Sequence, residues 1–214
     1  MKVRIKFQKY GAMKFIGHLD VMRYFQKAFR RAGYDSEYSK GFNPHQIMSF
    51  AAPLGVGLTG DAEYVDIGLV SCEDAELMVK KLNEVMSEGF YVTGFHILPE
   101  PEENEKRITA MSLVSAADYL VSLKDGYSLG DGAEGILTAD SFKEAFMDFY
   151  GRQDITIQKK TKKSEMDVNI KPMIRMLAFD EAEYKRGLED KLADTAEPVN
   201  NEQAYLLKAD SRAD

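Results

Sequence analysis

Alternating charged and apolar residues mark the start of the chain as a β-strand. Within residues 2–7, Val3, Ile5 and Phe7 share one face, and basic residues occupy the other. Residues 19–32 then carry apolar side chains at helical spacing, and Gly33 follows as a typical helix stop. The pattern therefore predicts a half-buried strand followed by an amphipathic helix.

The same patterns predict three more strands and a second helix. Residues 45–52 and 62–69 are expected to form an antiparallel pair, separated by a stretch rich in proline and glycine. Residues 72–88 predict a helix with Ser71 as its N-cap, and residues 90–98 predict the last strand. This β–α–β–β–α–β order is typical of an α+β protein with a ferredoxin-like split βαβ sandwich. In that fold four antiparallel strands carry both helices on one face.

A polar, proline-broken segment divides the chain into two predicted domains. Residues 100–106 are mostly glutamate, which is typical of a linker. We therefore expect a ferredoxin-like domain over residues 1–99 and a second α+β domain over residues 107–214.

The second half begins as another βα unit. Residues 119–123 predict a strand, and four apolar positions predict a helix that ends at Gly151. Residues 155–157 and 166–170 predict a hairpin, and residues 204–208 a short strand. We expect a second ferredoxin-like domain that is incomplete, as in a truncated chain.

Composition narrows the class of protein. The chain has 214 residues, 44% of them hydrophobic and 29% charged, which suffices for folded domains. Its apolar runs are too short to cross a bilayer, and its start lacks a signal peptide, so we expect a cytoplasmic protein without membrane contact. Cys72 is the single cysteine, which excludes a disulfide framework or a multi-cysteine cluster made by this chain alone.

Charge is distributed unevenly along the chain. The net charge is −7, yet residues 1–50 hold ten Lys or Arg against three acids, whereas residues 61–105 hold twelve acids against two lysines. A basic stripe is expected on the exposed flank of the first helix, made of Arg23, Lys27, Arg30 and Arg31. The predicted hairpin tip carries Lys159, Lys160, Lys162 and Lys163. Such surfaces attract nucleic acid, another phosphate-bearing ligand or an acidic partner, although a merely solvated flank is the alternative.

Two loops hold the candidate site. One, GHLD, leads into the first helix, and the other, KGFNPH, leads into the second strand. A helix N-terminus offers free N–H groups, and a glycine-containing loop lets its backbone approach a ligand closely. We expect the two loops to meet in one ligand-binding site, formed by Gly17, His18, Asp20, Arg23, Lys40, Gly41, Phe42, Asn43 and His45.

The chemistry of this site stays open between catalysis and structure. Because an imidazole group in general titrates near neutrality, His18 and His45 are, with Asp20, the candidates for proton transfer. The alternative is that all three only stabilise their turns through hydrogen bonds. They could also ligate a metal, but no His-x-x-x-His or cysteine spacing supports this, and we assign no metal site.

Several of these motifs resemble one family. They are residues 15–23 (FIGHLDVMR), 28–33 (AFRRAG), 40–45 (KGFNPH), 53–57 (PLGVG) with Glu63-Tyr64, and the weaker 167–174 (DVNIKPMI). Together they resemble the radical-SAM-linked family of uncharacterised bacterial proteins, over most of the chain. Members of this family continue past the final strand into another helical segment, which this chain lacks.

The resemblance implies an accessory role. Such domains are fused to, or encoded beside, radical-SAM enzymes, which would carry the iron–sulfur cluster and S-adenosylmethionine. This chain has no Cys-x-x-x-Cys-x-x-Cys motif, so we assign it no cofactor and expect it to work with a radical-SAM partner.

We therefore expect a substrate-binding module, without activity of its own, that presents RNA or another phosphate-bearing substrate. The first alternative is a His-dependent RNA-processing enzyme, similar to CRISPR repeat-processing endoribonucleases in architecture only, since their glycine-rich loop is absent near this C-terminus. The second alternative is a protein–protein adaptor.

Overall fold

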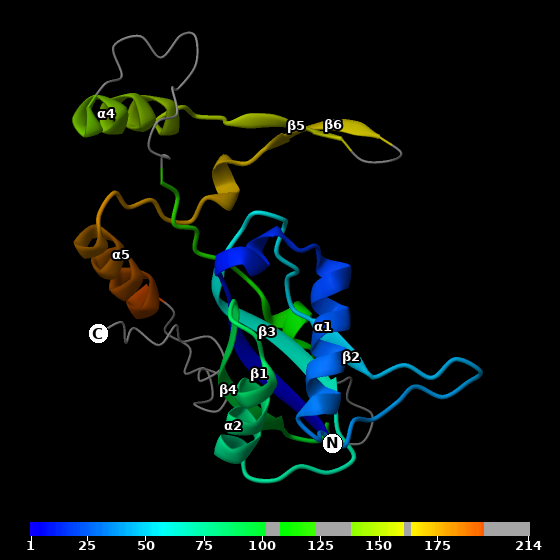
Figure 1. The fold of residues 1–214 in the computed structure, drawn as a ribbon. Coiled ribbons are helices and arrows are strands. Elements are labelled where there is room, and N and C mark those ends of the chain that lie inside the picture. Colours follow the sequence, from blue (N-terminus) through cyan, green and yellow to red (C-terminus); the bar gives the residue numbers. More distant parts are fainter. Residues whose placement is uncertain (102–107, 123–137, 161–163, 195–214) are drawn as a thin grey trace. The chain divides into compact units, whose positions relative to one another are not determined.

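The chain divides into two compact units, Met1–Leu120 and Val121–Asp214. The computed structural model describes residues 1–101, 108–122, 138–160 and 164–194 (Figure 1). Most of the linker predicted at 100–106 therefore lies outside the described residues. Residues 108–120 belong to the first compact unit.

The first unit is built on a four-stranded antiparallel sheet. Its strands are β1 (Lys2–Lys9), β2 (Met48–Phe50), β3 (Gly60–Gly68) and β4 (Phe90–Leu98), in the order β2-β3-β1-β4. β1 is central, and it pairs antiparallel with β3 on one side and β4 on the other. The structure thus confirms the α+β class and the antiparallel sheet predicted from the sequence.

The second strand is shorter than the predicted range 45–52. Ile47 N donates to Glu37 O, and Gln46 forms a β-bridge with Tyr38, so these residues pair with the segment that follows the first helix. Met48–Phe50 pair in register with β3, and Ile47 O and Ala51 N extend this pairing with bonds to Gly68 N and Tyr64 O.

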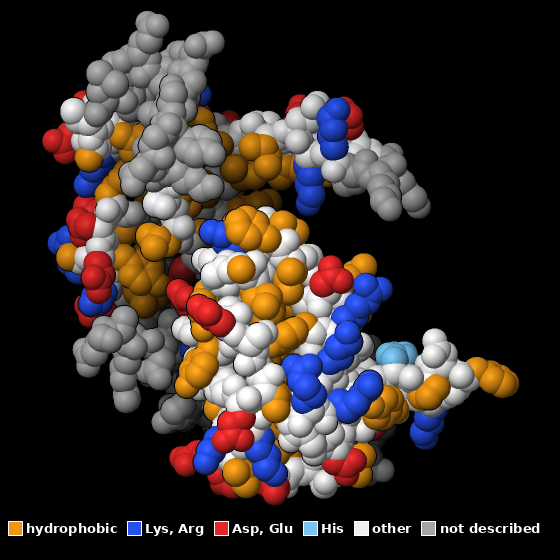
Figure 2. All heavy atoms as spheres, viewed as in Figure 1, with side chains coloured by type: hydrophobic (Ala, Val, Ile, Leu, Met, Phe, Trp, Pro, Cys, Tyr) orange, Lys and Arg blue, Asp and Glu red, His pale blue; other side chains and the backbone are white. Residues whose placement is uncertain are grey.

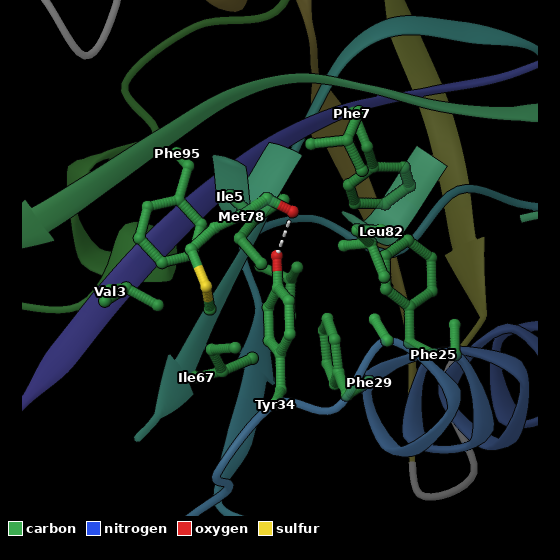
Figure 3. Packing of buried hydrophobic residues seen from close by; sticks show 14 of the residues in the cluster. Val3, Ile5, Phe7, Phe25, Phe29, Tyr34, Ile67, Met78, Leu82 and Phe95 are labelled. Atoms are coloured by element: carbon green, nitrogen blue, oxygen red, sulfur yellow. Dashed lines mark hydrogen bonds between the residues drawn. The ribbon is translucent and has the colours of Figure 1, made fainter. Parts of the chain in front are cut away.

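Two helices pack on one face of this sheet. They are α1 (His18–Arg31) and α2 (Ala75–Val85), and the buried residues of both belong to one hydrophobic cluster with β1, β3 and β4. The Tyr34 hydroxyl donates to Met78 O at 2.7 Å, which ties the segment after α1 to α2 (Figure 3). Both helices therefore lie where the sequence pattern predicts them.

Aromatic rings fill the middle of this core. Phe25 of α1 contacts Phe7 at 4.6 Å between ring centroids, and it also contacts the rings of Phe29, Phe50 and Phe90. These rings come from α1 and from the strands β1, β2 and β4. Figure 3 shows Phe7, Phe25 and Phe29 among them. Phe25 therefore holds α1 against the whole width of the sheet.

The prediction that Ser71 caps the second helix is wrong. The N-cap is Asp74, whose carboxylate accepts from Glu76 N at 2.9 Å. Ser71 instead donates its hydroxyl to Asp35 at 3.0 Å. A carboxylate is as good an N-cap as a hydroxyl, so two adjacent candidates compete and the sequence alone does not decide between them.

A buried ion pair lies on the other face of the sheet. Arg4 donates to both carboxylate oxygens of Asp66, its partner on β3, at 2.7 and 2.9 Å. Asp66 also accepts from Ala110 N at 2.7 Å, at the start of the short helix α3 (Ala110–Leu113). This carboxylate therefore fastens residues 109–113 over part of the sheet.

The described part of the second unit contains two α-helices and a hairpin. α4 (Ala139–Tyr150) is capped by Gly151, and β5 (Thr156–Lys160) pairs with β6 (Glu165–Asn169), as predicted. A single 3-10 turn, η2 (Lys171–Met173), and α5 (Glu181–Asp194) follow.

The prediction of a strand at 119–123 is wrong for the part that the structure describes. Residues 119–122 are irregular, and Tyr119, Leu120 and Val121 are exposed. These residues have β-forming side chains, but their backbone pairs with no strand in the part of the chain that the structure describes. Tertiary pairing decides whether such a run becomes a strand. The strand predicted at 204–208 lies outside the described residues.

Helix α5 is preceded by a local N-capping signal that hydrophobic periodicity does not detect. Asp180 accepts from Glu183 N at 2.8 Å, and Glu183 in turn accepts from Phe179 N. This is a D-x-x-E capping pattern.

Among the described residues, no helix is both long and apolar enough to span a membrane.

We expect Asp66→Ala to destabilise the first unit by about 3–5 kcal/mol, because it leaves the Arg4 guanidinium buried without its partner. Replacing both residues in Arg4→Met/Asp66→Leu should recover most of this loss. Urea unfolding measures both effects. Asp61→Ala, at an exposed position on the same strand, is the control. An equal cost for Asp66→Ala and Asp61→Ala would contradict this account.

Candidate functional site

The first turn of α1 carries two of the predicted site residues in different surroundings. Gly17 is the N-cap, and its carbonyl accepts from Asp20 N and Val21 N. Asp20 is exposed and forms an ion pair with Arg23 at 3.3 Å. A carboxylate in the first helical turn also suits the helix dipole. Asp20 therefore has a local structural role on the helix surface.

His18, in contrast, faces a small hollow in the first unit. Its ring lies edge-on to Phe50 with centroids 5.2 Å apart. The hollow has a cavity volume of about 20 Å³ and is lined by Phe7, Lys9, His18, Val21, Phe50, Ala52, Pro53, Leu54 and Glu63. Most of its wall is apolar, and three titratable side chains supply its polar groups.

Lys9 is the unexpected member of this lining. It is only 2% exposed, because it continues the inward-facing series of Val3, Ile5 and Phe7 along β1. Its ammonium donates to Ile16 O at 3.3 Å. Burial lowers the pKa of Lys9, and the nearby Glu63 carboxylate opposes that shift with a smaller effect. Continued by one more step, the alternation of residues 2–7 puts Lys9 on the apolar face, but it does not reveal which residues cover the side chain.

Glu63 is the acidic counterpart across the strand pair. It lies opposite Phe7 in the β1–β3 register, and therefore on the same face of the sheet. Burial raises the pKa of Glu63, and the Lys9 ammonium lowers it by less. Among the described residues, the Glu63 carboxylate has no hydrogen bond and no ion pair within 4.0 Å. The two charges thus face one hollow without direct contact.

The second predicted loop is held by contacts of its own. Tyr38 bridges to Gln46, Ser39 N donates to His45 O at 2.9 Å, and the Ser39 hydroxyl lies 2.8 Å from Nδ1 of His45. Residues 39–46 project from the first unit beside β2 (Figure 1). Phe42 is fully exposed, and Gly41 has φ 123°, a conformation that favours glycine.

The structure therefore brings His18 together with Lys9 and Glu63, and it does not place His45 in their hollow. His45 forms its hydrogen bonds inside its own loop, with Ser39 and Asn43. No hydrogen bond or ion pair joins the two loops in the described part of the chain. A single pocket holding both histidines stays a prediction.

The basic stripe is present on α1. Figure 2 shows Lys and Arg side chains in a row over this helix, where Arg23, Lys27, Arg30 and Arg31 are all exposed. Arg31 also donates to Val85 O at 3.0 Å, so it helps to hold α1 against α2. Lys27 and Arg30 have no hydrogen bond or ion pair within the described residues, and their charges point into solvent.

The second predicted basic cluster is described only in part. Lys159 and Lys160 are exposed on β5, and Lys160 forms an ion pair with Glu165 at 2.7 Å. Lys162 and Lys163 lie outside the described residues.

The fold and its features define an α+β protein with a basic helix flank and a small, mostly apolar hollow that three titratable side chains line. A family model described as "Uncharacterized protein conserved in bacteria (DUF2344)" matches residues 2–205. The chain belongs to this family. No curated protein and no solved structure matches it. The family description names no reaction, ligand or partner, so the link to radical-SAM enzymes stays a prediction.

We expect Lys9→Met to raise the pKa of Glu63 further, because the substitution removes the positive charge that lowers it. A carboxyl whose folded pKa is raised stabilises the fold fully below its unfolded pKa of about 4.5, and this contribution disappears as pH rises through the folded value. The Lys9→Met protein should therefore keep this acid-side contribution to a higher pH than the wild type.

Carbon-13 NMR titration of the Glu63 carboxyl measures this shift. Lys27→Met, which removes the same charge from the exposed flank of α1, is the control and should leave the Glu63 titration unchanged. An unchanged or lower pKa in Lys9→Met would show that the two groups do not interact.

Proposed function

We propose that the protein binds a phosphate-bearing polymer, RNA in particular, along the basic stripe of α1. The observation that carries this proposal is the pair Lys27 and Arg30, two exposed cations that have no acidic partner among the described residues, in a chain of net charge −7. The chain has 35 acidic residues, and within its described part the carboxylate that pairs with the stripe is that of Asp20, which bonds Arg23. A concentrated positive surface that is left open attracts a polyanion.

The exposed Phe42 favours a single-stranded polymer. A fully exposed aromatic side chain gains nothing for the fold, whereas nucleobases stack readily on aromatic rings. The hydrogen bonds between Ser39 and His45 hold the base of its loop, so the ring is presented on a defined support. Lys40 in the same loop adds a cation for the backbone phosphates.

The strand order also bears on which surface is used. We propose that β2-β3-β1-β4, with both helices on one face, is a ferredoxin-like split βαβ arrangement. Some RNA-binding modules with four-stranded sheets stack bases on the open face. Here Arg4 bonds Asp66 on that face, and Asp66 also accepts from Ala110 N. These groups are therefore occupied, which favours RNA binding on the helical side of the sheet.

We further propose that the chain serves a radical-SAM enzyme as its accessory or substrate-binding module. This rests on the resemblance of the GHLD and KGFNPH motifs, and on the single cysteine, which leaves a three-cysteine cluster site to the partner. Co-expression with a radical-SAM enzyme from the same genome, followed by gel filtration, tests this. Separate elution of the two proteins, with and without RNA, would contradict the proposal.

A second candidate is an RNA-processing enzyme that uses His18. It is favoured by the hollow, which places the His18 imidazole near a buried amine and a carboxyl. His18→Ala discriminates the two functions, since an enzyme would lose cleavage of bound RNA while a binding module would show no cleavage to lose.

Substitution of the basic stripe should weaken RNA binding and its salt dependence. For Arg23→Ala/Lys27→Ala/Arg30→Ala we expect at least about tenfold lower affinity near physiological salt, and a slope of log affinity against log salt smaller by about two. Arg31 is left in place because it also bonds Val85 O. Fluorescence anisotropy with a labelled single-stranded RNA measures both quantities.

The control removes the same charge from other surfaces, as Lys80→Ala/Lys81→Ala/Arg186→Ala. Equal salt slopes for the two triple variants would show that the stripe is only a solvated helix flank. In that case the adaptor interpretation would be the better one.

Phe42→Ala should lower the affinity for single-stranded RNA about tenfold, because it removes one stacking surface without disturbing any packed contact. Binding to double-stranded RNA, whose bases are already stacked, should not change. Phe15→Ala, at another exposed phenylalanine of the same unit, is the matched control. The same loss in both variants would argue against stacking on Phe42.

A further inference from the structure

The hollow beside α1 contains more hydrogen-bonding capacity than the protein uses. Lys9, Glu63 and His18 reach it from β1, β3 and the first turn of α1. Of these three side chains only Lys9 forms a hydrogen bond within the described residues, to Ile16 O at 3.3 Å. An ammonium has three N–H donors, so two remain. The remaining ammonium hydrogens and the Glu63 carboxylate can therefore bond a ligand that enters the hollow.

The charges select the chemistry of that ligand. Lys9 can only donate, and the ionised Glu63 can only accept. A phosphate in the hollow would be repelled by Glu63, and an amine would be repelled by Lys9. A hydroxyl satisfies both residues, since its oxygen accepts from the ammonium and its proton is donated to the carboxylate. The cavity volume of about 20 Å³ suits one water-sized group and is too small for a nucleobase.

The position of the hollow connects it to the basic stripe. His18 is the first residue of α1, and Arg23 follows five residues later, about 7.5 Å along the helix axis. In RNA every phosphate is next to a ribose that carries a 2′-hydroxyl. A strand whose phosphates contact the stripe therefore has ribose hydroxyls within about one nucleotide of the hollow.

We propose that the hollow binds a ribose 2′-hydroxyl between Lys9 and Glu63, and that it thereby makes this surface distinguish RNA from DNA. The proposal rests on the binding of RNA along α1 proposed above. His18 closes the hollow at its α1 side, with its ring against Phe50. Lys9 and Glu63 are binding residues in this account, and no covalent step is involved.

The experiment compares three strands of one sequence on the full chain. They are single-stranded RNA, the matching DNA, and the matching 2′-O-methyl RNA, which keeps the ribose oxygen but lacks the hydroxyl proton. For the wild type we expect RNA to bind at least about fivefold more tightly than either of the other strands, the effect of one hydrogen bond to a charged group.

Glu63→Met should abolish that preference, so that RNA and DNA bind equally well, while leaving the affinity for DNA unchanged. Lys9→Met should act in the same direction. Glu63 forms no hydrogen bond with any residue that the structure describes, so its variant keeps the test informative should Lys9→Met fail to fold. The triple variant of the stripe should bind all three strands more weakly, yet keep the preference for RNA.

Three results would overturn the inference. Equal binding of RNA and DNA by the wild type would show that no hydroxyl is recognised. A preference for RNA that survives in Glu63→Met would place the recognition elsewhere. Failure of the wild type to bind any of the strands would overturn the proposed function itself, and this inference with it, whereas the first two results leave the proposed function intact.

Discussion

The pairing of β1 with strands on both of its sides determines where the rest of the first unit lies. A strand paired with β3 and β4 has no free edge, so its side chains can only point to the two faces of the sheet. Val3, Ile5 and Phe7 take one face, and the helices must cover them. Lys9 follows with the same parity, so the alternation that builds the core also carries an amine to its end. The hollow beside His18 is therefore a consequence of how the core is made.

Two pairs of opposite charges on β1 and β3 show different physical solutions. Arg4 and Asp66 are direct cross-strand partners, and two hydrogen bonds plus the Ala110 amide satisfy them. Lys9 and Glu63 are offset in the register, since Glu63 lies opposite Phe7 and Lys9 opposite Gly60. This offset keeps their charges apart while both are withdrawn from water. A directly bonded pair is occupied by its own hydrogen bonds, whereas a separated pair leaves a donor and an acceptor that a ligand can use.

The sequence predicted what depends on neighbours along the chain and failed where distant residues decide. Period-two and helical patterns located β1, α1, α4 and the β5–β6 hairpin, and the stops at Gly33 and Gly151 are local signals. The strand expected at 119–123 did not form over 119–122, where no segment in the described part of the chain pairs with it. The basic stripe followed from helical spacing alone. The hollow did not, since the burial of Lys9 depends on residues as distant as Leu54 and Glu63.

The hydrogen bond from the Ala110 amide to Asp66 shows that the first unit includes residues beyond its last strand. A fragment stopped at residue 99 would contain all four strands and both large helices, yet water would reach the Arg4 guanidinium from the side that residues 109–113 now shield. The sheet would keep its strand order, but residues 109–113 would no longer cover part of its outer face. Any dissection of this protein should therefore cut after α3, so that the smallest autonomous piece carries the segment that seals the outer face.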